Sequence, residues 1–376
     1  MTIVIAQHCS ILPFGWMGVW LFYVISGYVI TRGFAEGAYA GTSFASRYGN
    51  FISRRLLRIA PIYFAYVALN AILLIAVSGA SRLGDLPYLI TFTYNWQVIF
   101  DPWPGRSGWA PFGHLWTLSV EQQFYLFFPF LALLVPPRRQ VPALMALIAV
   151  GPLLRWAWLA TIGSGFSWGS TLVSQGLFFG GLEYGVYASS ISHIDSFLTG
   201  ALIARFSPTL TQRRLASNML WVLALGATIA YVIFYVGVNY ENGARGYDLL
   251  RNVISNNPHG QYREVFVYCA VNLLAAAVLL HVLLERRGSH ALASRPAAWI
   301  GRVSYGGYLL HVAVLLAVGS PLIDAFPDLN IWIRRIAAFA IVWCITIALA
   351  SISFRYFESP IARHWRRRRV SSGPLG

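Results

Sequence analysis

One stretch decides the fold: HLWTLSVEQQFY, residues 114–125, runs directly into LFFPFLALLV, residues 126–135. At the helical spacing i, i+4, i+7 and i+11, one face of this stretch would carry His114, Leu118, Glu121 and Tyr125. Ionisable side chains in an apolar helix are costly, so they usually face a bundle interior or a cavity and mark a functional pathway. The alternative is a structural Glu121 that hydrogen-bonds two helices together.

The composition is that of an integral membrane protein. Hydrophobic residues make up 57% of the 376 residues and charged residues 11%, with a mean hydropathy of +0.59, whereas about a quarter of the residues of a soluble domain are charged. We expect an all-α fold, a polytopic transmembrane helix bundle of about ten spans. The expected spans lie at residues 1–12, 16–31, 61–79, 114–135, 141–161, 191–206, 218–238, 263–284, 298–318 and 332–357. Residues 87–100 are also apolar, but Pro87, Asn95 and Gln97 favour an interfacial or re-entrant piece.

The distribution of charge indicates the topology and argues against a nucleic-acid partner. All 28 basic residues are arginine, and the formal net charge is +15. The positive-inside rule places the arginine-rich connections and both termini in the cytoplasm. These connections lie at residues 32–58, 138–139, 205–214, 286–302 and 363–369. No basic stripe carries the interleaved exposed aromatic residues that nucleic-acid binding needs.

The chain is expected to form a single membrane domain, residues 1–362, followed by a basic cytoplasmic tail, residues 363–376, that anchors to lipid headgroups. A signal peptide is not expected, because the chain has no basic start and no small-residue cleavage site. The first span is peculiar, since the seven residues before His8 are too few to cross a bilayer.

Polar residues inside the apolar runs form a pattern. Ser26 and Gly27 lie midway through a span, where small residues allow close helix approach, and the alternative role of Ser26 is simply to join membrane helices. Arg55 and Arg58, at i and i+3, face together at the cytoplasmic start of another span, which suits them to grip phosphates. Their alternative role is that of a plain positive-inside anchor.

Further polar residues fall in the remaining apolar runs, namely His8, Asp195, Ser304, Tyr308 and His311. The last three share a helical face, at i, i+4 and i+7. A lone buried histidine is more often a packing residue than a catalyst, but ionisable residues distributed over many helices predict a shared internal site. The spacing of the three cysteines predicts neither a disulfide framework nor a metal site.

Six motifs in chain order resemble those of the acyltransferase-3 family, bacterial membrane acyltransferases that O-acylate cell-surface carbohydrates. The resemblance is collinear and covers nearly the whole chain. The matching segments are His8 with GVWLFYVISGYVI (18–30), RRLLRIAP (54–61), WTLSVEQQFY (116–125), DSFLTGA (195–201), IGRVSYGGYLLH (300–311) and FRYFESP (354–360).

The resemblance implies transfer from a cytoplasmic acyl-CoA, usually acetyl-CoA, to a hydroxyl of a cell-envelope polysaccharide or glycolipid, in the bacterial cytoplasmic membrane. Acyl-CoA is then a cosubstrate, and no bound cofactor is implied. By position, His8 matches the essential histidine, Arg55 and Arg58 the paired arginines at the donor entrance, and Ser26 and Glu121 polar positions of the site. An alcohol is a weak nucleophile, so a neutral His8 imidazole is the expected general base. Other candidates to line the site are His114, Gln123, Tyr125, Asp195, Ser304, Tyr308 and His311.

One position departs from the family pattern. The family places an arginine about eleven residues before the essential histidine, about 20° away on the helix face, and here that position would precede Met1. We expect the natural start to lie upstream, and the alternative is a non-catalytic family member. A transporter or flippase for a glycan precursor or small solute is a further alternative, disfavoured by the arginine pair and by the absence of an internal repeat.

Overall fold

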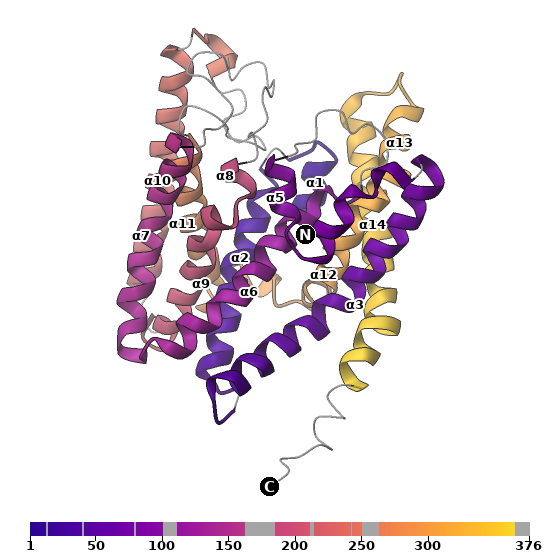
Figure 1. Ribbon diagram of the computed structural model, residues 1–376. Helices are drawn as coiled ribbons and strands as arrows, with labels where there is room; N and C mark the ends of the chain where they lie inside the picture. Colours follow the sequence, from indigo (N-terminus) through magenta and orange to yellow (C-terminus); the bar gives the residue numbers. More distant parts are fainter. Residues whose placement is uncertain are drawn as a thin grey trace.

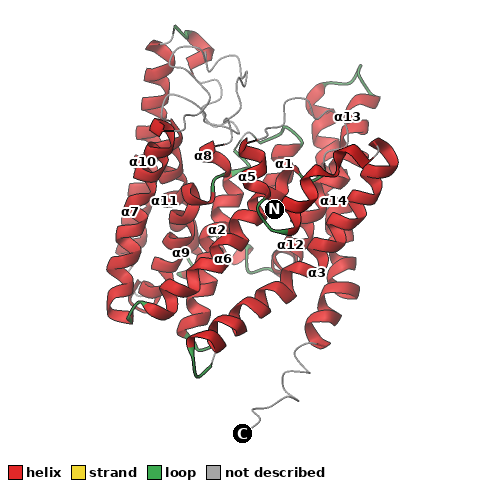
Figure 2. Ribbon diagram, viewed as in Figure 1, coloured by secondary structure: helices red, strands yellow, loops and turns green. Residues whose placement is uncertain are grey.

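The structure, a computed structural model, describes residues 1–12, 14–39, 41–78, 80–100, 111–161, 185–210, 214–241, 243–249 and 263–364. Within these ranges every regular element is a helix (Figure 2). The prediction of an all-α fold is therefore confirmed. Most of the expected basic tail, from residue 365 onward, lies outside the described residues.

Long helices form the body of the described chain. They are α2 (Met17–Ala35), α3 (Phe44–Ser78), α6 (Trp116–Leu134), α7 (Pro137–Thr161), α9 (Ser190–Leu210), α10 (Arg214–Glu241), α11 (Arg263–Leu283), α12 (Arg295–Val314) and α14 (Ile331–Ser353). The short α-helices are α1 (Thr2–His8), α4 (Leu86–Ile90), α5 (Tyr94–Phe100), α8 (Gly185–Ala188) and α13 (Ser320–Ala325). Short 3₁₀ turns are η1 (Ala80–Asp85), η2 (Gly113–Leu115), η4 (Gly246–Leu249) and η5 (Ser289–Ala291), and π-helical turns are η6 (Leu315–Gly319) and η7 (Phe354–Glu358).

Seven helical segments of the described chain are long and apolar enough to cross a membrane, those containing α2, α3, α7, α10, α11, α12 and α14. The two other long helices, α6 and α9, carry buried polar side chains, among them Glu121 and Asp195. α1 has seven residues, fewer than the roughly 20 that a span needs. The expected number of about ten spans is therefore not confirmed. The stretch 87–100 holds only the short α4 and α5, as expected for a piece that does not span.

The helices form two groups around a central layer (Figure 1). One group contains α7, α10 and α11, the other contains α3, α12 and α14, and α2, α6 and α9 lie between them. The short α1 packs against α2 and α14. α2 and α14 end, and α3 and α7 begin, at the end from which the C-terminal tail leaves, so this end carries Arg32, Arg138 and Arg363.

Glycines bring α2 and α9 into backbone contact. A Cβ atom placed on Gly27 of α2 would lie 1.9 Å from the carbonyl oxygen of Phe197, and one on Gly200 of α9 would lie 1.8 Å from the carbonyl oxygen of Val24. No larger residue fits at either position without moving a backbone. The expectation that small residues near Ser26 allow close helix approach is confirmed.

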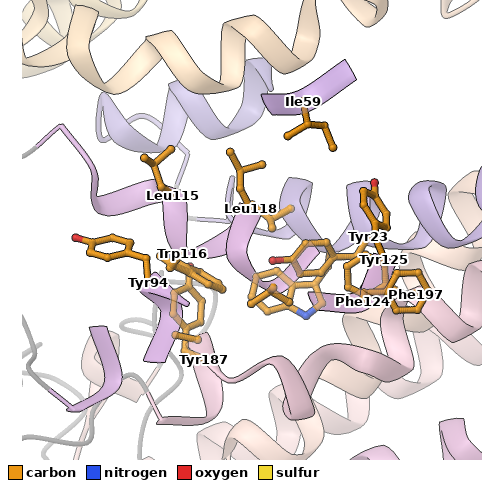
Figure 3. Close-up of a cluster of buried hydrophobic side chains, with 14 of the residues drawn as sticks. Tyr23, Ile59, Tyr94, Leu115, Trp116, Leu118, Phe124, Tyr125, Tyr187 and Phe197 are labelled. Carbon is orange, nitrogen blue, oxygen red and sulfur yellow. The ribbon is translucent and has the colours of Figure 1, made fainter. Parts of the chain in front are cut away.

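Aromatic side chains fill the space between the central helices (Figure 3). Phe197 of α9 stacks on Phe124 of α6, with ring centroids 4.1 Å apart, and on Tyr23 of α2, at 4.4 Å. All three side chains are buried. Stacked rings at these distances add to the stabilisation from burial alone. They fix how α2 and α6 face each other, which positions the polar residues described next.

Candidate active site

Three histidines from distant segments meet beside the N-terminal helix. His8 ends α1, His114 lies in η2 just before α6, and His311 lies in the last turn of α12. The ring centroids of His8 and His311 are 5.1 Å apart, and those of His114 and His311 are 4.9 Å apart. His114 and His311 are buried, whereas His8 is exposed. The cluster joins two buried imidazoles to one that a substrate can reach.

Neighbouring backbone and hydroxyl groups hold this cluster in place. His311 Nδ1 lies 2.6 Å from the carbonyl oxygen of Tyr308, and His114 Nε2 lies 3.1 Å from that of Leu309. The Tyr308 hydroxyl is 2.7 Å from the Thr117 hydroxyl and donates to the His114 carbonyl oxygen at 3.2 Å. α6 and α12 are therefore tied together at the level of the histidines.

A second polar cluster lies further along α6, at Glu121. The Ser26 hydroxyl donates to Glu121 Oε1 at 3.1 Å and lies 2.7 Å from the Tyr125 hydroxyl, which also donates to Oε1. All three side chains are buried. This geometry confirms that Glu121 and Tyr125 share the inward face predicted from their spacing. It also confirms that Glu121 joins two helices, since Ser26 belongs to α2.

The arginine pair of α3 faces the carboxylate of this second cluster. Arg55 is half-buried, donates to the Tyr39 hydroxyl at 3.1 Å and lies over the Tyr125 ring, 5.3 Å from its centroid. Arg58 is exposed. Both guanidinium groups are close enough to attract the Glu121 carboxylate. Arg55 thus provides a positive charge inside the bundle, and Arg58 can be reached from outside it.

A cavity of about 60 Å³ is bounded by α1, α2, α6 and α12. Part of its wall is apolar, with Val4, Val19 and Leu118. The hydroxyl-bearing part of the wall consists of Tyr23, Thr117, Ser304, Tyr305 and Tyr308. Tyr308 also contacts His114 and His311, and Thr117 lies one helical turn before Glu121 on α6. The cavity therefore adjoins the histidine cluster, and its α6 wall leads toward the second cluster.

Comparison with protein families decides the assignment. A family model described as an acyltransferase domain, that of the acyltransferase-3 family, matches residues 2–354. The chain belongs to the acyltransferase-3 family. The resemblance recognised in the six sequence motifs is thereby confirmed.

Several acyltransferase-3 relatives are similar over nearly the whole chain. OatA of Listeria monocytogenes, a peptidoglycan O-acetyltransferase, is 26% identical over 385 residues, which cover 96% of this chain and 54% of OatA. A Staphylococcus aureus protein whose name proposes an O-acetyltransferase is 25% identical over 370 residues, 94% of this chain and 54% of its own. A Bacillus subtilis protein whose name proposes a peptidoglycan O-acetyltransferase is 24% identical over 362 residues, with coverages of 92% and 50%. The chain spans about half the length of these relatives. No solved structure matches it.

Of the predicted site residues of this acyltransferase-3 chain, Ser304 and Tyr308 line the cavity, and Gln123 and Asp195 belong to neither polar cluster. Gln123 donates to the carbonyl oxygen of Phe92 at 2.8 Å and to Asn95 Oδ1 at 2.9 Å. Two residues after Glu121, its side chain points about 200° around the helix. Asp195 Oδ2 accepts a hydrogen bond from Arg155 Nη1 at 2.8 Å, and both side chains are buried.

Several residues of the observed polar network are absent from the prediction. Arg155 of α7 reaches α9 through the Ser192 carbonyl oxygen, at 2.7 Å, and α11 through Cys269 Sγ, at 3.2 Å. One sequence signal could have found it, because opposite charges in two apolar runs usually pair. The hydroxyls of Tyr23 and Thr117 carried no such signal, since tyrosine and threonine are common in membrane helices. Among the described residues, no group of three or more His, Cys, Asp or Glu side chains is arranged to hold a metal ion.

Proposed function

We propose that this chain transfers an acyl group, most simply acetyl, from cytoplasmic acyl-CoA to a hydroxyl of a cell-envelope carbohydrate or glycolipid. The observation that carries the proposal is a cavity whose wall includes Tyr308, which contacts His114 and His311, and Thr117, which lies one helical turn before Glu121 on α6. Membership of the acyltransferase-3 family supports acyl transfer. The name of the Listeria relative, a peptidoglycan O-acetyltransferase, supports acetyl as the group and a carbohydrate as the acceptor.

The charge distribution supports entry of the donor from the cytoplasm. Arg32, Arg138 and Arg363 lie at one end of the bundle, and the positive-inside rule makes this end, with the C-terminus, cytoplasmic in a bacterial inner membrane. Arg55 and Arg58 lie on α3, which begins at this end. Guanidinium groups bind phosphates through paired, charge-assisted hydrogen bonds, so these two arginines would hold the phosphates of CoA.

The chemistry assigned to His8 is general base catalysis. The acceptor oxygen attacks the thioester carbonyl carbon while the His8 imidazole takes the hydroxyl proton. A carbon–oxygen bond forms, the carbon–sulfur bond breaks, and the proton on His8 passes to the departing CoA thiolate. The hydroxyls of Ser304 and Tyr308 on the cavity wall donate to the backbone oxygens of Gly301 and His114. Either hydroxyl, turned toward the substrate, would stabilise the negative charge that develops on the carbonyl oxygen.

The test supplies acetyl-CoA with a radiolabelled acetyl group to membranes that contain the full chain and measures label in envelope carbohydrate. Wild type should transfer label, and His8→Ala should lower the rate by about 100-fold or more. The matched control is His290→Ala, since His290 is exposed in η5 outside the bundle interior. Equal transfer by wild type and His8→Ala would remove His8 as the base. Solute movement without consumption of acetyl-CoA would instead identify a transporter.

A further inference from the structure

The two buried histidines of the cluster have fixed tautomers. The backbone oxygens of Tyr308 and Leu309 can only accept hydrogen bonds, so the ring nitrogens that face them carry the protons. His311 is therefore protonated on Nδ1 and His114 on Nε2. In the neutral ring, the opposite nitrogens, His311 Nε2 and His114 Nδ1, are acceptors. Both are buried and have no hydrogen-bond partner among the described residues.

An unpaired acceptor in a buried site costs free energy unless a donor reaches it during function. His311 has a donor-bearing neighbour in the exposed imidazole of His8, whose ring centroid is 5.1 Å away at an interplanar angle of 62°. His8 is the last residue of the short α1 and is exposed, and no hydrogen bond from the described residues holds its ring, whereas Nδ1 of His311 is held by the Tyr308 carbonyl oxygen. A modest rotation would bring one His8 ring nitrogen toward His311 Nε2.

A general base needs one unprotonated nitrogen aimed at the substrate, and the hydrogen bond made by its other nitrogen determines which one that is. We propose that His311 is the positioning residue of His8: its Nε2 accepts the N–H of His8 and leaves the second His8 nitrogen free to take the acceptor proton. This inference rests on the proposed function. His114 packs against the other side of His311, at 4.9 Å, and limits the rotation of that ring.

The same contact also serves the step after proton transfer. The protonated His8 carries two N–H groups, one directed at the departing thiolate and the other at His311 Nε2. A buried acceptor stabilises such a cation without itself changing its protonation state, the role that a carboxylate plays in a catalytic triad. His311 does not contact the reacting atoms in this scheme, so its removal should lower kcat more than it changes KM.

Three substitutions at position 311 separate this role from simple packing. Gln can place an amide oxygen where Nε2 lies and retain the acceptor. Asn can still donate to the Tyr308 carbonyl oxygen from the Nδ1 side but offers no acceptor to His8. Phe keeps the ring volume and loses both nitrogens. For acetyl transfer by the full chain in lipid nanodiscs, His311→Asn and His311→Phe should lose on the order of 100-fold in kcat. Their KM for acetyl-CoA should stay within about twofold, and His311→Gln should retain activity within about tenfold of wild type.

A second readout does not depend on turnover. Solid-state NMR of the full chain in lipid, with nitrogen-15 histidine, detects the coupling between two nitrogens that share an N–H···N hydrogen bond. One such correlation should appear in wild type, disappear in His8→Ala and His311→Asn, and persist in His290→Ala. Its absence from wild type, or equal kcat for the Asn and Gln variants, would overturn the role of His311. A correlation in a protein that transfers no acetyl would leave the hydrogen bond standing and reject the proposed function.

Discussion

Ser26 of α2 donates a hydrogen bond to Glu121 of α6 at 3.1 Å, and the Tyr125 hydroxyl donates to the same carboxylate oxygen. The second oxygen, Oε2, is buried without a hydrogen-bond partner in the described chain, while Arg55 and Arg58 attract the carboxylate. Glu121 thus has two functions in one side chain. Its Oε1 atom accepts the hydrogen bond that joins α2 to α6, and its negative charge attracts the two arginines of α3.

Glu121→Gln should separate these two functions. The amide oxygen can still accept from Ser26 and Tyr125, so the protein should fold, but Arg55 loses its internal counter-charge. A hydrogen bond to a charged group contributes about 1.5–3 kcal/mol and a neutral one about 0.5–1.5 kcal/mol, so the loss of charge should lower acetyl transfer by about 5- to 10-fold. Steady-state transfer from labelled acetyl-CoA measures the effect. Glu285→Gln, at an exposed glutamate, is the matched control, and equal activities for both variants would contradict a role for the Glu121 charge.

Adding one methyl group between α2 and α9 should destabilise the bundle. Gly27→Ala and Gly200→Ala each place a Cβ atom within 2 Å of a backbone oxygen, and overpacking of this kind costs about 1–3 kcal/mol or more. Gly226→Ala is the control, because nothing lies within 4 Å of its added Cβ atom in α10. Thermal unfolding in detergent should show lower midpoints for the first two variants. An equal effect at all three positions would mean that the close approach of α2 and α9 is unimportant.

The buried ion pair of Arg155 and Asp195 should behave as a structural link. Asp195→Leu leaves a buried guanidinium without its partner, which costs about 3–5 kcal/mol. Replacing Arg155 by Leu as well should restore part of the lost stability, because no unpaired charge then remains. The exposed pair of Arg32 and Glu36 provides the comparison, and Glu36→Leu should change the unfolding midpoint little. Strictly additive effects of the two core substitutions would argue against direct coupling.

The sequence predicted the central polar network but not its separate parts. Spacing along one helix is enough to place Glu121 and Tyr125 on one inward face, and the structure shows that Ser26, also a predicted site residue, donates to Glu121 from a neighbouring helix. Gln123 lies about 200° from Glu121 on the same helix and therefore faces away from this cluster. The sequence places Asp195 in the shared site because it does not reveal the partner of this carboxylate. That partner is Arg155, a single arginine in another apolar run.

Helix positions were predicted more reliably than the number of spans. Apolar runs locate the long helices because the membrane-facing sides of the bundle need apolar residues. α6 and α9 are different, since they lie in the central layer and bury polar side chains against protein. Hydropathy alone therefore does not identify them as spans. The meeting of His8, His114 and His311 depends on tertiary packing of three distant segments, and only the face shared by Tyr308 and His311 was visible in the sequence.

The arginine pair offers the sharpest test of how the donor binds. Arg55→Ala combined with Arg58→Ala should raise the KM for acetyl-CoA by about 100-fold or more, because each of the two lost charge-assisted hydrogen bonds to phosphate contributes roughly 1.5–3 kcal/mol. The KM for the acceptor should change far less. Arg138→Ala combined with Arg139→Ala removes the same charge from the same end of the bundle, at two exposed positions. If both double variants raised the donor KM equally, the pair on α3 would only attract CoA by general electrostatics. A selective effect of the α3 pair is expected, since Arg55 lies over the ring of Tyr125, whose hydroxyl donates to Glu121 in the second polar cluster.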